Sequence, residues 1–195
     1  VEQNTLVWFL SDNGGPATNV APTCNAPFRG HKGALYEGGI HVPFALRWPA
    51  AVKSGTVIDA PVISLDIFAT ALALAGAKPA PGKQPDGLSL VPLLKGDAAA
   101  FKDRALHWRD GGGKANKWAV RQGPWKLVRS GTLAQPGPLE LYDLAADIGE
   151  THSVLAAHPD VAERLQKLHD AWNAELIEPL FQSPKAAKKK NKQKR

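Results

Sequence analysis

The sequence of 195 residues contains no methionine and a single cysteine, Cys24. One cysteine excludes an internal disulfide and leaves the redox compartment undecided. The apolar stretches are too short and too interrupted to cross a bilayer. No basic segment precedes an apolar run with a small-residue cleavage site, so we predict no signal peptide in this chain. Because methionine is absent, we also expect that Val1 is not an initiator position.

Acidic residues are missing from residues 185–195, which hold seven of the 24 lysines and arginines. The remaining residues carry 17 basic and 18 acidic groups, so the net charge of +6 comes from this tail. Such a tail can bind nucleic acid or an anionic surface. It has no aromatic residues for base stacking and no apolar face for a membrane. We therefore expect a disordered, solvated tail, with neither nucleic acid nor membrane as a partner.

Gly-x-Ser-x-Gly and Walker-type loops are also absent, which removes support for serine-hydrolase and P-loop chemistry. Instead, a continuously apolar segment, residues 5–10, precedes Asp12, Asn13 and two glycines. The apolar segment is typical of a parallel strand buried on both faces, and ligands bind beyond the carboxyl ends of such strands. A carboxylate and an amide oxygen suit calcium or magnesium. The alternative for these four residues is a simple turn.

A second polar segment, residues 29–39, places Lys32 between Gly30 and Gly33. A lysine on such a loop offers a point charge to an anionic oxygen, or is a solvated surface amine. His31 is next to it and either contacts a bound ester or has a structural role. Glu37 is expected to hold the glycine loop by accepting backbone N–H groups.

Together these segments resemble the formylglycine-dependent sulfatases of the arylsulfatase type, in the alkaline phosphatase superfamily. The resemblance extends from Thr5 to about Leu176, and the matching blocks are residues 10–15, 29–33, 36–44, 64–70, 119–127 and 140–144. It implies that Asp12 and Asn13 are calcium ligands, that Lys32 is catalytic and contacts the sulfate group, and that His31 contacts the substrate. The implied substrate is a sulfate ester, and a sulfated carbohydrate is one candidate.

The family's nucleophile segment, Cys-x-Pro-x-Arg, is not found in the sequence. Cys24 lies in a segment one residue too long and on the wrong side of Asp12, so we interpret it as a loop cysteine. The chain thus resembles the C-terminal part of a sulfatase, with formylglycine expected in an N-terminal part that its fold would need. We expect residues 1–195 alone to be inactive, and a full-length family member to be periplasmic or secreted. The alternatives are a phosphodiesterase or phosphatase of the superfamily, and a non-catalytic remnant or binding module.

The predicted fold class is α/β. Residues 1–100 are expected to form the C-terminal portion of an alkaline-phosphatase-like catalytic domain with part of its parallel sheet. Residues 101–184 are expected to form an antiparallel sheet packed by a long helix, and residues 185–195 the basic tail. Strands are predicted at 5–10, 44–48 and 139–142, with a hairpin around a turn at residues 122–124.

Two helices are predicted from apolar residues at helical spacing. The first follows Ser64 as N-cap, has Asp66 as a capping acid and ends near Gly76. The second begins at Pro159. The apolar stripes expected to face the core are Leu65, Phe68, Ala69 and Leu72 in the first helix, and Val161, Leu165, Leu168, Trp172 and Leu176 in the second.

Overall fold

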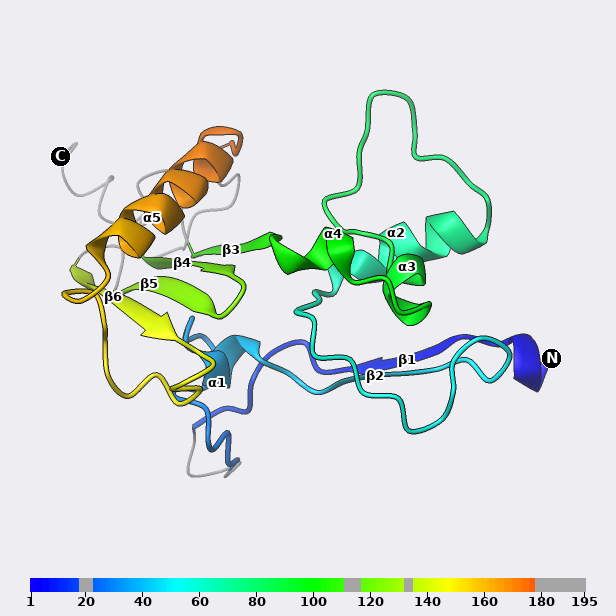
Figure 1. Ribbon diagram of the computed structural model, residues 1–195, viewed down its shortest axis with the longest axis horizontal. Coiled ribbons are helices and arrows are strands. Elements are labelled where there is room, and N and C mark those ends of the chain that lie inside the picture. Colours follow the sequence, from blue (N-terminus) through cyan, green and yellow to red (C-terminus); the bar gives the residue numbers. More distant parts are fainter. Residues whose placement is uncertain (18–22, 111–116, 132–134, 178–195) are drawn as a thin grey trace, which may run out of the picture. The chain divides into compact units, whose positions relative to one another are not determined.

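The structure is a computed structural model of the whole chain that describes residues 1–17, 23–110, 117–131 and 135–177. The chain forms two compact units, each of which contains segments that are distant in sequence (Figure 1). Unit 1 consists of Val1–Asp12 and Val42–Arg104, and unit 2 of Asn13–His41 and Ala105–Arg195. Residues 13–41 therefore belong with the C-terminal sheet. The predicted division at residue 100 into separate domains stays a prediction.

Unit 1 begins with a short 3-10 helix, Glu2–Asn4, followed by strand β1 (Val7–Leu10). β1 pairs with β2 (Phe44–Arg47) in antiparallel register, with Leu10 opposite Phe44. The two strands were predicted, but the expectation that the first is a parallel strand buried on both faces differs from the structure. Phe9 is 69% and Val7 48% exposed, and these two side chains share one face of the strand. Among the described residues, β1 has β2 as its one neighbouring strand.

The first predicted helix is α2 (Leu65–Leu74), and it is followed by two single-turn helices, α3 (Val91–Leu94) and α4 (Ala99–Lys102). Its predicted apolar stripe is wrong in part, since Leu65 and Phe68 are 51% and 60% exposed. The buried face of α2 consists instead of Asp66, Ala69 and Thr70.

Asp66 explains this choice of face, because its buried carboxylate needs partners on the inner side. Its oxygens accept the backbone N–H groups of Ile63 at 2.9 Å and Leu88 at 2.8 Å. The Arg104 guanidinium binds both oxygens, at 2.8 and 2.7 Å. Asp66 lies in the first turn as predicted, but its carboxylate binds groups outside α2, and Ser64 makes no side-chain capping bond.

Helix α2 is terminated, as predicted, near Gly76, which follows the C-cap residue Ala75 and has a φ of 60°. The Ala77 N–H donates to the Leu72 carbonyl at 3.0 Å, the six-to-one bond of a Schellman motif. The small core of unit 1 contains Leu90, Leu93 and Phe101, with Trp8 and Phe44 packed against it.

Unit 2 contains a four-stranded antiparallel sheet in the order β3-β4-β5-β6. Its strands are β3 (Ala105–Asp110), β4 (Lys117–Gln122), β5 (Trp125–Gly131) and β6 (Pro136–Asp143). A hairpin turn was predicted at residues 122–124. Gln122 belongs to β4 and pairs with Trp125, so the turn itself consists of Gly123 and Pro124. The Gly123 φ of 58° is a conformation that glycine adopts without strain.

Helix α5 (Pro159–Ala174) covers one face of this sheet (Figure 1). Ala162 and Leu165 of the helix pack against Trp118, Val120 and Leu127 of the sheet, with Val161 and Leu168 at the border. The helix and its stripe are confirmed except for Leu176, which lies past the end of α5 and is exposed.

The α/β class and the antiparallel sheet with its helix agree with the prediction. The predicted tail, residues 185–195, lies outside the described residues. No helix within the described ranges is long and apolar enough to cross a membrane.

Candidate functional site

The two glycine-containing segments of the sequence cross each other in unit 2. The Gly14 N–H donates to the Gly39 carbonyl at 2.9 Å. A Cβ atom built on Gly14 would lie 1.8 Å from the Gly38 carbonyl oxygen, and one built on Gly38 would lie 2.4 Å from the Gly30 oxygen. Backbone therefore packs directly on backbone here, which no residue larger than glycine permits. Residues 13–15 are brought next to the loop that carries Lys32.

That loop is shaped by Gly30 and Gly33, which both have a φ of 87°. Between them, the Lys32 N–H donates to the Gly15 carbonyl at 3.1 Å. The Lys32 side chain is exposed. A fixed backbone with an exposed ammonium suits a residue that meets an anion from solution, and equally a surface amine, so the catalytic and sulfate-binding role of Lys32 stays a prediction.

The other predicted site residues lie as follows. Asp12 is exposed and is the last residue of the first segment of unit 1. Asn13 is half-buried in unit 2, and its Nδ2 lies 3.4 Å from the Gly14 carbonyl oxygen. His31 is exposed, with Nδ1 3.0 Å from the Lys32 carbonyl oxygen, so this ring nitrogen contacts its own loop. Cys24 is an exposed free cysteine, as predicted.

The chemistry of Asp12 and Asn13 fits calcium, since both side chains carry hard oxygen donors. Calcium takes six to eight oxygen ligands, so two residues supply only part of a set. Among the residues that the structure describes, no group of three or more His, Cys, Asp and Glu side chains could hold a metal ion.

A buried cluster of charges is centred on Glu37, four residues after the Gly33 of the Lys32 loop. Helix α1 (Glu37–Ile40) begins at Glu37, whose Oε1 is 2.7 Å from the Lys126 ammonium of β5. The same ammonium is 2.9 Å from Glu150 Oε1. Glu150 Oε2 accepts the Glu37 backbone N–H at 2.6 Å, which closes a ring of three residues. The expectation that the Glu37 carboxylate accepts backbone N–H groups of the glycine loop differs from the structure, in which it binds basic side chains.

The Glu37 carboxylate has two further partners at its other oxygen. Oε2 is 2.8 Å from His41 Nδ1 and 3.5 Å from a nitrogen of Arg121. Burial alone would raise the pKa of Glu37, but the hydrogen bond from His41 and the neighbouring cations lower it to about 2. Burial raises the pKa of Glu150 despite the attraction of Lys126. The cluster thus holds one firmly ionised carboxylate and one that is costlier to ionise.

Arg29 forms a second link between the loop and the sheet. Its guanidinium carbon lies 3.9 Å from the centre of the Tyr36 ring. One guanidinium nitrogen donates to Tyr142 Oη at 2.7 Å and to the Glu150 carbonyl at 3.1 Å. Tyr36 in turn donates its hydroxyl hydrogen to Glu140. These contacts indicate that Arg29 fastens the loop to β6.

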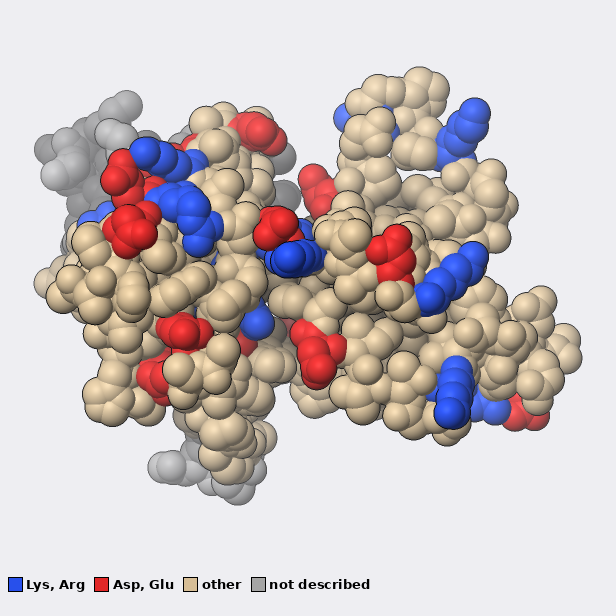
Figure 2. Space-filling view, viewed as in Figure 1, with Lys and Arg blue, Asp and Glu red and all other residues tan. Residues whose placement is uncertain are grey.

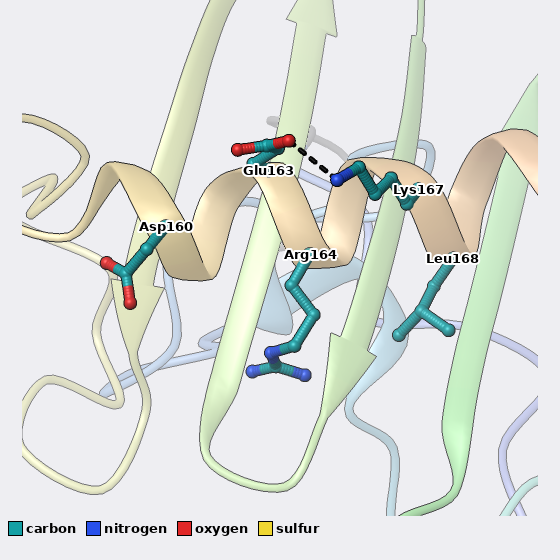
Figure 3. Close-up of a pocket in the computed structure, with 5 residues that line it drawn as sticks. All are labelled: Asp160, Glu163, Arg164, Lys167 and Leu168. Atoms are coloured by element: carbon teal, nitrogen blue, oxygen red, sulfur yellow. Dashed lines mark ion pairs between the residues drawn. The ribbon is translucent and has the colours of Figure 1, made fainter.

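A shallow surface pocket of about 390 Å³ follows α5 (Figure 3). It is lined by Asp160, Glu163, Arg164, Lys167 and Leu168, and an ion pair of 2.6 Å joins Glu163 to Lys167. It contains none of the predicted site residues. On the face drawn in Figure 2, basic and acidic side chains are interspersed over a mostly uncharged surface, in keeping with the near-neutral charge of residues 1–184.

The sequence pattern did not identify Asn25, Lys126 or Glu150. Lys126 and Glu150 bind partners far away in sequence, so no periodicity marks them. Asn25 binds backbone groups of its own irregular loop region, where there is no periodicity either. A local signal existed for Glu37 and His41, because their spacing of four residues places them on one face of a helix.

The comparisons with known proteins agree with this structure. The family model described as N-sulphoglucosamine sulphohydrolase, C-terminal, matches residues 30–176. A sulfatase of Formosa agariphila is 31% identical over 191 residues, and the match covers 88% of this chain and 33% of the relative. Human arylsulfatase A is 32% identical over 190 residues, with 85% of this chain and 37% of the relative covered.

Among solved structures, the crystal structure of Ps i-CgsB in complex with k-i-k-neocarrahexaose is similar, with a TM-score of 0.77 at 29% identity. That match covers 92% of this chain and 40% of the other. The chain therefore belongs to the sulfatase family, in which it corresponds to the C-terminal part. It spans roughly a third of the length of these relatives.

Proposed function

We propose that this chain contributes part of the active site of a sulfuric ester hydrolase. The observation that supports this proposal is the crossing of residues 13–15 with the Lys32 loop, which places a hard-oxygen side chain and a cation on one rigid backbone framework. A sulfate ester needs both kinds of group, because its sulfate group is negatively charged and its leaving oxygen gains charge as the ester bond breaks.

In this proposal Asp12 and Asn13 are calcium ligands, and calcium, when bound, neutralises the sulfate oxygens. Lys32 donates hydrogen bonds to the sulfate group and stabilises its charge. His31 contacts the ester part of the substrate. The substrate class is a sulfated carbohydrate, by analogy with Ps i-CgsB, whose structure holds k-i-k-neocarrahexaose.

We further propose that residues 1–195 do not hydrolyse sulfate esters by themselves. Hydrolysis through a covalent intermediate needs a nucleophile. The Cys-x-Pro-x-Arg pattern that would supply formylglycine is not found in these residues, and Cys24 lies outside it. The exposed Phe9 of β1 further supports the need for additional protein to cover this strand.

The test compares turnover of an aryl sulfate and an aryl phosphate, with calcium present, by residues 1–195 and by the full-length protein that carries them. We expect the full-length protein to turn over the aryl sulfate and residues 1–195 to turn over neither substrate. Preference for the aryl phosphate would favour a phosphatase or phosphodiesterase, and inactivity of both proteins would favour a binding module. Turnover by a monomer of residues 1–195 would refute the proposed dependence on further protein.

A further inference from the structure

Asn25 lies between the two backbone segments that carry the proposed site. Its Oδ1 accepts the Gly15 N–H at 2.9 Å, and its Nδ2 donates to the Gly15 carbonyl at 3.0 Å. The same Nδ2 donates to the Gly30 carbonyl at 3.3 Å. A side-chain amide has both the acceptor and the two donors that this arrangement uses.

Each segment is held close to a proposed site residue. Gly15 is two positions after Asn13, and Gly30 is two positions before Lys32. The Gly15 carbonyl also accepts the Lys32 N–H, so the contact made by Asn25 and the contact made by Lys32 share one oxygen. A shift of Gly15 therefore moves the backbone of Lys32 as well.

The absence of a side chain at Gly15 permits this close contact. Gly15 has no side chain to separate it from Asn25, since a Cβ there would lie 3.0 Å from Asn25 Oδ1 and 2.4 Å from Thr23 Oγ1. Glycine loops without such a link keep much conformational freedom, which is unsuited to holding two groups at a fixed spacing.

We propose that Asn25 is a positioning residue, which fixes the spacing between the Asn13 amide and the Lys32 ammonium. This inference rests on the proposed function, because the spacing matters only if both side chains act on one bound sulfate ester. Asn25 acts through backbone groups of Gly15 and Gly30 and needs no contact with substrate.

The test uses two variants of the full-length protein, Asn25→Asp and Asn25→Ala, with Asn4→Asp as an exposed control. Aspartate keeps the size of asparagine but loses both donated hydrogen bonds, and its charge repels the two carbonyl oxygens. We expect kcat for an aryl sulfate to fall at least about tenfold in both Asn25 variants, because small misplacements of reacting groups are costly. The Asp variant should be impaired as much as the Ala variant or more.

A second measurement tests sulfate binding at Lys32 without relying on turnover. Acetylation of Lys32 by an amine-reactive reagent is followed by peptide mass spectrometry, with and without inorganic sulfate. We expect sulfate to protect Lys32 in the unaltered protein, and at least about tenfold more sulfate to be needed in the Asn25 variants.

Three results would overturn the role of Asn25: unchanged kcat and protection, an Asp variant much milder than the Ala variant, or a loss of activity fully explained by unfolding. If the unaltered protein neither hydrolyses an aryl sulfate nor shows sulfate protection, the proposed function fails, and the role of Asn25 fails with it.

Discussion

The Lys126 ammonium lies 2.7 Å from Glu37 Oε1, and both side chains are almost completely buried. A buried ammonium is stable only when its charge is compensated, and the nearby Glu150 carboxylate adds to this compensation. The pair joins strand β5 to the start of α1. The central strands of unit 2 and the loop that carries Lys32 are therefore held together by charge.

The first prediction concerns this pair. Replacing Lys126 with methionine keeps most of the side-chain volume but leaves two carboxylates buried next to each other. We expect a loss of about 3–5 kcal/mol in the free energy of unfolding, the usual cost of removing one partner of a buried ion pair. Chemical denaturation measures it. The matched control is Lys167→Met, which removes the exposed pair with Glu163 and should change stability far less. Equal effects of the two substitutions would contradict the buried pair.

The second prediction concerns calcium. Asp12→Ala in the full-length protein is expected to abolish calcium retention and aryl sulfate turnover, because it removes a charged ligand from a hard-cation site. Asn13→Ala should have a weaker effect of the same kind. Metal content of the purified protein is measured beside turnover, with the exposed Asp59→Ala as control. Normal calcium content in the Asp12 variant would show that Asp12 is not a calcium ligand.

The third prediction concerns Lys32. Lys32→Ala is expected to lower kcat/KM for an aryl sulfate. The loss of transition-state stabilisation should be roughly 2–4 kcal/mol, the scale for one preorganised charge-stabilising group. Its exposed side chain contributes little to folding, so the unfolding midpoint should stay the same. Lys53→Ala, another exposed lysine, serves as control. Unchanged kinetics in the Lys32 variant would make it a surface amine.

The fourth prediction concerns acid stability of unit 2. The His169 ring stacks on Trp118 at 4.0 Å, and the His107 ring stacks on Trp172 at 4.9 Å. Burial lowers the pKa of both histidines, that of His107 to about 4. Above the unfolded pKa of about 6.5 both rings are neutral and stability is complete; as the pH falls towards 4, the unfolded chain binds protons first and stability is lost.

Thermal unfolding between pH 7 and pH 5 measures this effect, in a range above the titration of Glu37. Glu150 works in the opposite direction, because its raised pKa favours the folded state at lower pH. The comparison is therefore with the double variant His107→Phe and His169→Phe, which keeps aromatic rings. We expect the decline in midpoint to be shallower in that variant, and parallel declines would contradict the assignment.

The elements that the sequence predicted correctly are those with local signals. The hairpin of β4 and β5 follows from alternating apolar residues and the dipeptide Gly123-Pro124, and α5 follows from Pro159 and a helical stripe. The sulfatase family was also predicted correctly from the sequence, since the resemblance rests on short blocks of residues in a fixed order.

The buried face of α2 could not be predicted in this way. Its apolar stripe suggested the core, but the carboxylate of Asp66 determines the orientation through Arg104, 38 positions away. Lys126 was not predicted for the same reason, since a contact between distant segments leaves no periodic pattern in either segment. Asn25 was not predicted because its partners are backbone groups of a region without periodicity. The roles of Asp12, Asn13, His31 and Lys32 stay predictions.

The ion pair of Glu37 and Lys126 also orders events during synthesis, because the two residues are 89 positions apart. When Glu37 leaves the ribosome, Lys126 has not yet been made. Burying the Glu37 carboxylate without a partner would be energetically costly. We therefore expect the glycine loop to stay hydrated until β5 has been synthesised. Contacts over such separations close slowly. The Lys32 loop is thus made well before strand β5, and we expect it to reach its final form only after that strand.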